Sequence, residues 1–140
     1  MHIEIHGRRD ADAPTLVFSS GLGGAAHFWM PQLDALTSDY RVVLYDQLGT
    51  GKSPATLPTE YSIDAMASEL RTLLASHGIG DYHLIGHALG GLVGLALAIQ
   101  QAPGLRSLTL MNAWSRVSPH TARCFSVRKQ LLAGSGPAAY

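Results

Sequence analysis

The segment with the clearest chemical implication is Gly86-His-Ala-Leu-Gly90, which separates a short apolar run from a long apolar stretch. Glycines on both sides of its centre allow a strand to turn sharply into a helix, since a Cβ atom there would collide with the turn. Gly91 and Gly94 supply further room. This is the layout of the G-x-S-x-G turn that presents a nucleophile. The central residue here is Ala88, and a methyl group cannot attack a carbonyl carbon.

Two other glycine-rich segments allow different chemistry. Gly21-Leu-Gly-Gly-Ala-Ala26 fits the dinucleotide pattern G-x-G-x-x-G/A, and Asp46 stands roughly where an acid that binds ribose is expected. This dinucleotide-binding alternative stays open, although it leaves the other segments unexplained. Gly49-Thr-Gly-Lys-Ser53 resembles the end of a P-loop, but Asp46 occupies the place of the first glycine and Pro54 follows the motif. A tight turn is therefore the better interpretation of this segment.

The remaining residue types limit the chemistry further. The single cysteine, Cys124, excludes an internal disulfide. No two histidines have convincing metal-ligand spacing, so we expect neither a metal nor a cofactor. The histidines occupy positions 2, 6, 27, 77, 83, 87 and 120.

The charged residues are distributed unevenly. Every aspartate and glutamate lies between Glu4 and Asp81, whereas the charged residues among residues 82–140 are all arginine or lysine. These cations either form a basic binding face or are balanced by acids beyond the end of the chain. We expect most of them on a solvated helical face, with one arginine as a candidate contact for an anionic substrate. The residues of this cluster are Arg116, Arg123, Arg128 and Lys129.

Alternating elements must position these segments. Short apolar or alternating runs predict strands, and amphipathic or wholly apolar stretches predict helices. The predicted strands span residues 2–6, 15–19, 41–45, 82–85 and 105–111, and the predicted helices span residues 28–36, 61–76, 88–101 and 122–132. Such alternation indicates a parallel sheet with helices on both faces. Ligands bind at the carboxyl ends of such strands, which places the chemistry at residues 20–24, 46–53, 86–90 and 112–116.

The composition is that of a folded protein. The 140 residues are 46% hydrophobic and have a formal net charge of +0, which excludes a disordered chain. The same balance gives no electrostatic reason to bind nucleic acid or a membrane surface. The N-terminus has no apolar signal segment, and the longest apolar run, at residues 84–99, is too short to span a bilayer. We therefore expect a cytoplasmic protein.

Four segments, taken in order, resemble the α/β-hydrolase fold superfamily. Ser20-Gly21-Leu22 is similar to its oxyanion turn, and residues 46–53 are similar to its D-x-R-G-x-G-x-S segment, with Leu48 where arginine is usual. Residues 86–91 resemble its nucleophile turn, and residues 108–114 resemble its sixth strand. The resemblance covers most of residues 14–125.

This resemblance implies an α/β-hydrolase fold, with a mostly parallel sheet and helices on both faces. About five of the superfamily's eight strands are expected, in a core over residues 1–115. The start of a helical lid is expected over residues 116–140. The fold is thus expected to be incomplete, with the chain cut short inside the lid.

The resemblance also implies roles for individual residues. The backbone N–H groups of Leu22 and Leu89 are expected to form the oxyanion hole, and Ala88 occupies the nucleophile position. The acid and histidine of the superfamily's triad follow later strands, so no triad is assigned within this chain. The residues expected to contact substrate are His27, His87 and Trp114.

Within the superfamily, the combined motifs are most similar to hydrolases of pyrimidine (uracil) breakdown. This similarity implies hydrolysis of a C–N bond in 3-aminoacrylate or carbamate by an oxyanion hole and water, without a serine nucleophile. Two alternatives remain: a serine esterase whose nucleophile is replaced at Ala88, and a non-catalytic binding protein of the same fold. The expected partner is a small-molecule substrate, and a homodimer is the candidate assembly.

Overall fold

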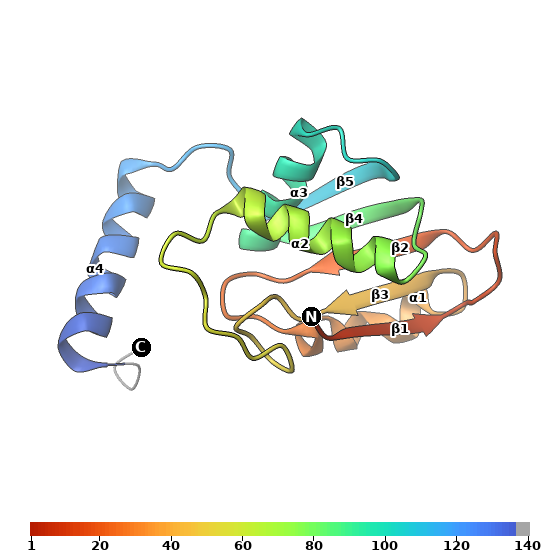
Figure 1. Cartoon of the computed structure of the whole chain (residues 1–140), viewed down its shortest axis with the longest axis horizontal. Helices are drawn as coiled ribbons and strands as arrows, with labels where there is room; N and C mark the ends of the chain where they lie inside the picture. The colour runs from red at the N-terminus through yellow and green to blue at the C-terminus, as the bar shows by residue number, and fades with distance from the viewer. Residues whose placement is uncertain (137–140) are drawn as a thin grey trace.

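The computed structural model describes residues 1–136 and arranges five strands in one sheet (Figure 1). The strands are β1 (Ile3–Gly7), β2 (Thr15–Ser19), β3 (Arg41–Tyr45), β4 (Tyr82–His87) and β5 (Leu105–Met111). Their order across the sheet is β1-β3-β2-β4-β5. The β1–β3 pair is antiparallel and the other pairs are parallel, which confirms the predicted mostly parallel sheet.

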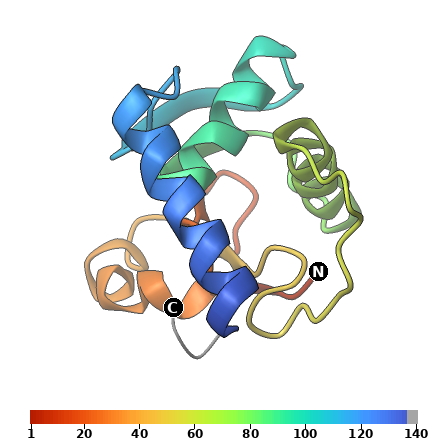
Figure 2. The same ribbon diagram turned by 90° about the vertical axis from the view of Figure 1, so that its left-hand side faces the viewer.

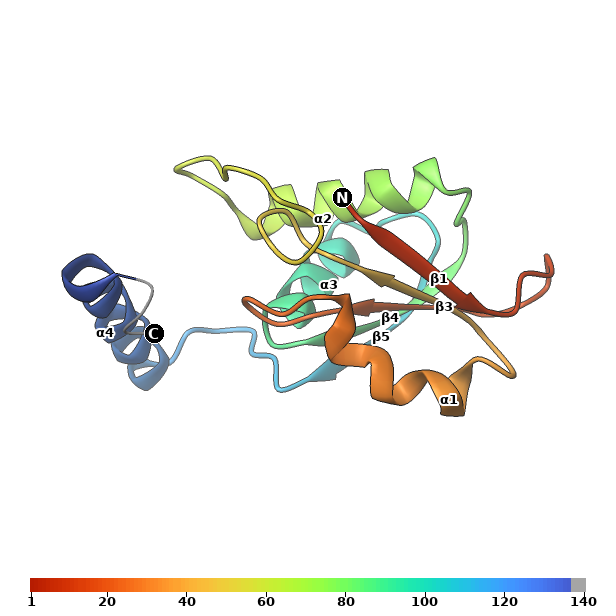
Figure 3. The ribbon, with the colours of Figure 1, turned by 90° about the horizontal axis from the view of Figure 1, so that it is seen from below.

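Helices cover both faces of this sheet (Figure 3). One face carries α2 (Ile63–Ser76) and α3 (Leu89–Ile99), and the other carries η1 (Ala26–Gln32) and α1 (Leu33–Leu36). Alternate residues of a strand point to opposite faces, so each strand contributes to both cores. In β3, Val43 packs with α2 and α3, whereas Val42 packs with η1 and α1.

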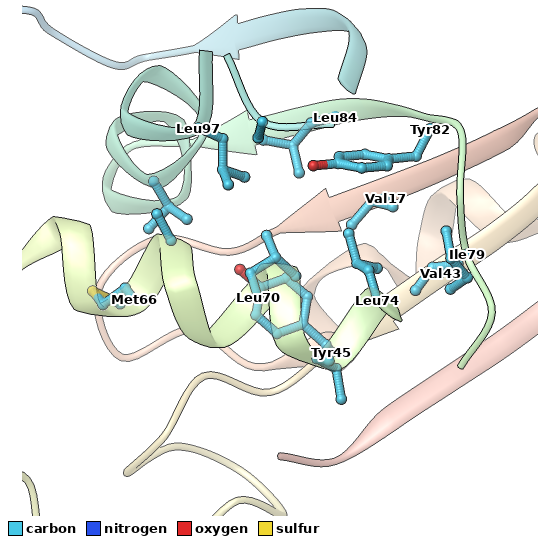
Figure 4. Close-up of a cluster of buried hydrophobic side chains, with 14 of the residues drawn as sticks. Val17, Val43, Tyr45, Met66, Leu70, Leu74, Ile79, Tyr82, Leu84 and Leu97 are labelled. Carbon is cyan, nitrogen blue, oxygen red and sulfur yellow. The ribbon is translucent and has the colours of Figure 1, made fainter. Parts of the chain in front are cut away.

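The larger core lies between the sheet and α2 and α3 (Figure 4). Val17 and Val43 of the sheet lie opposite Leu70 and Leu74 of α2, and all four side chains are buried. Burying such side chains stabilises the fold by about 1.5–3 kcal/mol each. This packing holds the carboxyl ends of β2, β3 and β4 in fixed positions beside one another.

Two of the predicted helices differ most from the structure. The helix predicted at residues 28–36 is instead a 3₁₀ helix followed by a single α-helical turn. Pro31 lies inside the 3₁₀ segment and has no N–H to donate, which interrupts α-helical hydrogen bonding. The helix predicted at residues 122–132 is the longer α4 (Pro119–Ser135). The Ser118 hydroxyl caps it by accepting a hydrogen bond from the Thr121 N–H at 3.1 Å.

Helix α4 stands beyond the carboxyl ends of β2 and β3, apart from the sheet, and none of its described residues is buried (Figure 1). The division into a core over residues 1–115 and a lid over residues 116–140 stays a prediction, and its last four residues, 137–140, lie outside the described residues. Within the described part of the chain, no helix is both long enough and apolar enough to cross a membrane.

Candidate active site

Ala88 forms the turn between β4 and α3, as the glycine pattern predicts. Its φ of 48° and ψ of −112° are unusual for a residue with a side chain, and such a conformation costs about 1–3 kcal/mol. Hydrogen bonds on both sides hold it in place. The Ala88 N–H donates to the Met111 carbonyl at 2.9 Å, and the Ala88 carbonyl accepts from the Gly91 N–H at 3.0 Å. The structure therefore presents the Ala88 side chain at a strained, sharply bent position.

Glycine is required around Ala88 because neighbouring atoms leave no room for a side chain, and not because the backbone there must be flexible. A Cβ atom at Gly86 would lie 2.5 Å from the Gly90 carbonyl oxygen, and one at Gly90 would overlap the Ser19 carbonyl oxygen. A Cβ atom at Gly91 would lie 2.5 Å from the Ala113 Cβ. These contacts bring α3 close against β2 and β4, and they confirm the sharp strand-to-helix turn predicted at residues 86–90.

The turn after β2 lies directly against this bend. A Cβ atom on Gly21 would stand 3.0 Å from the His87 Nδ1 and 3.4 Å from the Ala88 Cβ. The Ser20 hydroxyl anchors the turn, since it donates to the Ala25 carbonyl at 3.1 Å and accepts from the Trp29 indole at 3.0 Å. The segments predicted to form an oxyanion hole are thus adjacent in space.

The Asp46 side chain connects two loops of the same region. Its buried carboxylate accepts hydrogen bonds from the backbone N–H groups of Ala26 and Lys52, each at 2.7 Å. In the dinucleotide-binding alternative, Asp46 would bind the ribose, but both of its carboxylate oxygens already accept hydrogen bonds from backbone N–H groups. Residues 49–53 form a tight turn, closed by the Gly49 N–H and the Ser53 carbonyl at 2.8 Å, and no helix begins at Ser53. This arrangement supports the turn interpretation of that segment over a P-loop.

Leu22 and Leu89 line a common cavity of about 600 Å³ between the core and α4. Among residues 1–136, neither backbone N–H donates to a protein acceptor. Leu89 is also the first residue of α3, where the helix dipole favours negative charge. The two amides are thus available to an oxygen atom of a bound molecule. The other lining residues are Gly23, Gln47, Leu48, Gly49, Thr50, Leu57, Tyr61, Ile63, Met66, Phe125, Arg128, Lys129 and Leu132.

The three side chains predicted to contact substrate lie in different places. His87 is half-buried beside Ala88, and its ring stacks on Phe28 with centroids 5.2 Å apart. His27 is exposed on η1, and Trp114 is half-buried after β5. None of the three is among the residues that line the cavity, so their contact with a substrate stays a prediction.

Sequence reasoning missed part of the cavity wall. Tyr61 lines the cavity, and its hydroxyl donates to the Glu69 carboxylate. Burial and this acidic partner raise the pKa of Tyr61, so the hydroxyl stays protonated.

Arg128 and Lys129 line the cavity although most of the basic cluster is expected on a solvated face. The spacing of Phe125, Arg128, Lys129 and Leu132 places them on one side of a helix, but it does not show that this side faces the cavity. In the described part of the chain, no cluster of three or more histidine, cysteine or acidic residues could hold a metal ion.

Comparison with known proteins places this geometry in a family. A family model described as "alpha/beta hydrolase fold" matches residues 14–137. Proteins named "Putative carbamate hydrolase RutD" from Stutzerimonas stutzeri and Pseudomonas savastanoi are 65% and 59% identical over 140 residues. The alignments cover 100% of this chain but 53% and 54% of those proteins, so the chain spans about half their length.

A solved structure gives the same result for the backbone. The enol-lactonase from Burkholderia xenovorans LB400 matches with a TM-score of 0.86 and 31% sequence identity. The match covers 99% of this chain and 52% of that one. The adjacent turns around Ala88, the sheet that holds them and the family match over most of the chain lead to one conclusion: the chain belongs to the alpha/beta hydrolase fold family.

Proposed function

We propose that the protein hydrolyses a C–N bond of a small carboxylic acid, 3-aminoacrylate or carbamate, in pyrimidine breakdown. The observation that carries the proposal is the pairing of a methyl group at position 88 with two available amides, at Leu22 and Leu89. The site keeps the means to stabilise a developing negative charge and has no nucleophile at the bend. The names of the relatives from Stutzerimonas and Pseudomonas support carbamate as one substrate.

The proposed chemistry needs no covalent intermediate with the protein. 3-Aminoacrylate is an enamine, and proton transfer to its second carbon gives an imine. Water adds to the imine carbon, and loss of ammonia leaves malonate semialdehyde. Carbamate reacts in the same sense, since addition of water and cleavage of the C–N bond give bicarbonate and ammonia. Both reactions require an oriented water molecule, proton transfer and stabilisation of charge on oxygen.

Ammonia release tests this function directly. The protein is expected to release ammonia from 3-aminoacrylate or carbamate faster than a reaction without protein. Leu22→Pro removes one of the two N–H donors, and loss of such a donor lowers kcat by roughly 100-fold or more. Leu22→Ala keeps the N–H and serves as the matched control. Equal rates with and without protein, or full activity in a folded Leu22→Pro variant, would contradict the proposal.

A serine hydrolase with its nucleophile replaced is the second candidate. It is favoured by the likeness to the 31% identical enol-lactonase, whose backbone match covers 99% of this chain. In this case the Ala88→Ser variant would hydrolyse a p-nitrophenyl ester, and the natural protein would release no ammonia. If neither activity is found and the protein still binds small acids, a non-catalytic binding protein is the remaining candidate.

A further inference from the structure

The core side of the cavity contains a buried amide side chain, that of Gln47, which follows β3. Only 4% of this residue is exposed, and its Nε2 donates a hydrogen bond to the Ser20 carbonyl at 3.1 Å. Ser20 begins the turn that carries Leu22, so this hydrogen bond connects Gln47 to one of the two available amides. Figure 2 looks onto the carboxyl ends of β2, β3 and β4, where these segments lie, with α4 crossing in front.

The orientation of the Gln47 amide follows from its neighbours. The Ser20 carbonyl can only accept a hydrogen bond, so the NH2 group must face it and the Oε1 atom must point elsewhere. Burial raises the pKa of Tyr45 to about 12, and hydrogen bonds with Ser19 and Gln47 oppose this increase. A hydrogen bond lowers the pKa of a phenol when it is donated to the phenol oxygen, so Gln47 presents its N–H group to Tyr45 as well.

The Gln47 Oε1 atom is left as an acceptor that faces the cavity. No residue among 1–136 donates a hydrogen bond to it. In the described part of the chain, the Tyr82 hydroxyl is the buried side-chain atom that lacks both a hydrogen bond and contact with solvent. The Oε1 atom therefore keeps contact with solvent, and the solvent that reaches this buried residue is that of the cavity. Such an acceptor is suited to an N–H or O–H group of a bound molecule.

Both substrates of the proposed function offer an N–H group at the required place. In 3-aminoacrylate and in carbamate, an amino group is bonded to the carbon that water attacks. The Leu22 and Leu89 amides donate to the oxygen that forms on this carbon, whereas Gln47 accepts from its nitrogen. The nitrogen gains positive charge when the imine is protonated and when ammonia leaves. The hydrogen bond to Oε1 then becomes charge-assisted, which makes it roughly twice as strong.

We propose that the Gln47 side-chain oxygen binds the amino group of the substrate and selects molecules with an N–H donor on the reacting carbon. This inference rests on the proposed function, because it assigns a contact to the same substrate. The position of Gln47 is determined by β3 and by the turn after β2, so the contact does not depend on α4. Gln47 is thus a specificity-determining residue for small molecules that carry a primary amino group on a trigonal carbon.

Propionamide and butanone form a matched pair of probes, because they share shape and carbonyl oxygen and differ by an NH2 group in place of a methyl group. Binding of each is measured by NMR titration of the backbone amides of the protein. Gln47→Met is expected to weaken propionamide binding about fivefold and to leave butanone binding nearly unchanged. A residue that only anchors the turn at Ser20 would affect both probes equally, so the difference between the probes reports the contact itself.

Two further variants complete the test. Gln47→Glu keeps the side-chain shape and an acceptor oxygen, so it is expected to bind propionamide about as tightly as the natural protein does. Gln32→Met makes the same chemical change as Gln47→Met at an exposed position of η1, on the other face of the sheet, and should change neither probe. No propionamide binding, an equal loss of both probes in Gln47→Met, or an equal loss in Gln32→Met would overturn the inference. If Gln47→Met does not fold, weakened propionamide binding in Gln47→Glu would overturn it.

The ammonia assay separates this inference from the proposed function. If the substrate is hydrolysed and Gln47→Met leaves kcat and KM unchanged, the inference fails and the function stands. If no ammonia is released but the two probes behave as expected, the function fails and the contact with Gln47 stands. A decrease of kcat of about tenfold in Gln47→Met would support both, because it reports a contact that strengthens as charge develops on the nitrogen.

Discussion

At position 88, one methyl group determines both the strain of the bend and the absence of a nucleophile. The backbone there has a φ of 48°, a region that residues with side chains rarely adopt. The bend is held by hydrogen bonds to Met111 and Gly91, so the surrounding fold imposes the conformation. A substitution that removes the Cβ atom should therefore relieve strain without altering the path of the chain.

We expect Ala88→Gly to raise the free energy of unfolding by about 1 kcal/mol. Relief of the strained backbone contributes about 1–3 kcal/mol, and the extra freedom of glycine in the unfolded chain offsets about 0.4–1 kcal/mol. Urea denaturation followed by circular dichroism measures the change. Ala98→Gly, at an exposed position of α3, is the matched control and should lower stability by about 1 kcal/mol. A loss of stability in Ala88→Gly equal to that in the control would show that the bend is not strained.

Among the elements, the edge strand β1, which pairs with β3, carries a cluster of side chains around the Glu4 carboxylate. Glu4 lies 2.8 Å from the His2 Nε2, 3.0 Å from the Lys52 Nζ and 3.3 Å from the His6 Nε2. The hydrogen bond with His2, followed by that with Lys52, lowers the pKa of Glu4 to about 2. Lys52 belongs to the turn that Asp46 organises, so this cluster connects the edge strand to the site region.

The lowered pKa of Glu4 predicts a defined pH dependence of stability. Because the folded protein favours the ionised carboxylate, its contribution is complete above the ordinary value of 4.5 and is lost as pH falls toward about 2. Glu4→Gln should thus be less stable than the natural protein at pH 7, and the difference should shrink between pH 4.5 and pH 3. Urea midpoints measured across this range test the expectation. Glu60→Gln, at an exposed position, is the control, and a difference that does not change with pH would refute the account.

The elements themselves were largely predictable because their patterns are local. The glycines at positions 86, 90, 91 and 94 identify the bend, since close contact with β2, β4 and β5 leaves no other residue type room. The helix predicted at residues 28–36 is present as a 3₁₀ segment and one α-helical turn, because Pro31 has no N–H and favours the 3₁₀ form. The start of α4 was missed although Ser118 and Pro119 form a typical helix beginning.

The cavity could be predicted only in part from the sequence. Leu22 and Leu89 follow from the motifs, because each lies in a turn whose position is determined by its neighbouring strand. Arg128 and Lys129 do not follow, because periodicity shows which residues share a face of α4 but not which way that face points. The path of residues 112–118 determines that orientation, and no local pattern encodes it.

At the scale of the whole molecule, the outer edge of β5 and nearby apolar side chains are exposed to solvent. In the described sheet, β5 pairs with β4 on one side and with no strand on the other. Ile99 is 81% exposed, and Leu110 and Met111 are 44% and 42% exposed. An unpaired edge strand beside apolar surface favours pairing with a second chain. We therefore predict that a homodimer, if the chain forms one, pairs through the outer edge of β5.

We therefore expect the 140-residue chain to self-associate, with a sedimentation coefficient that rises with protein concentration. Leu110→Lys should weaken the association, because a charged residue on an edge strand opposes strand pairing and reduces the apolar surface. Thr72→Lys adds the same charge at an exposed position of α2, on a different element, and should leave the association unchanged. A monomer at all concentrations, with a single cooperative thermal transition, would show that the unpaired edge of β5 does not cause self-association. An equal effect of the two variants would mean that net charge, rather than this edge, controls the association.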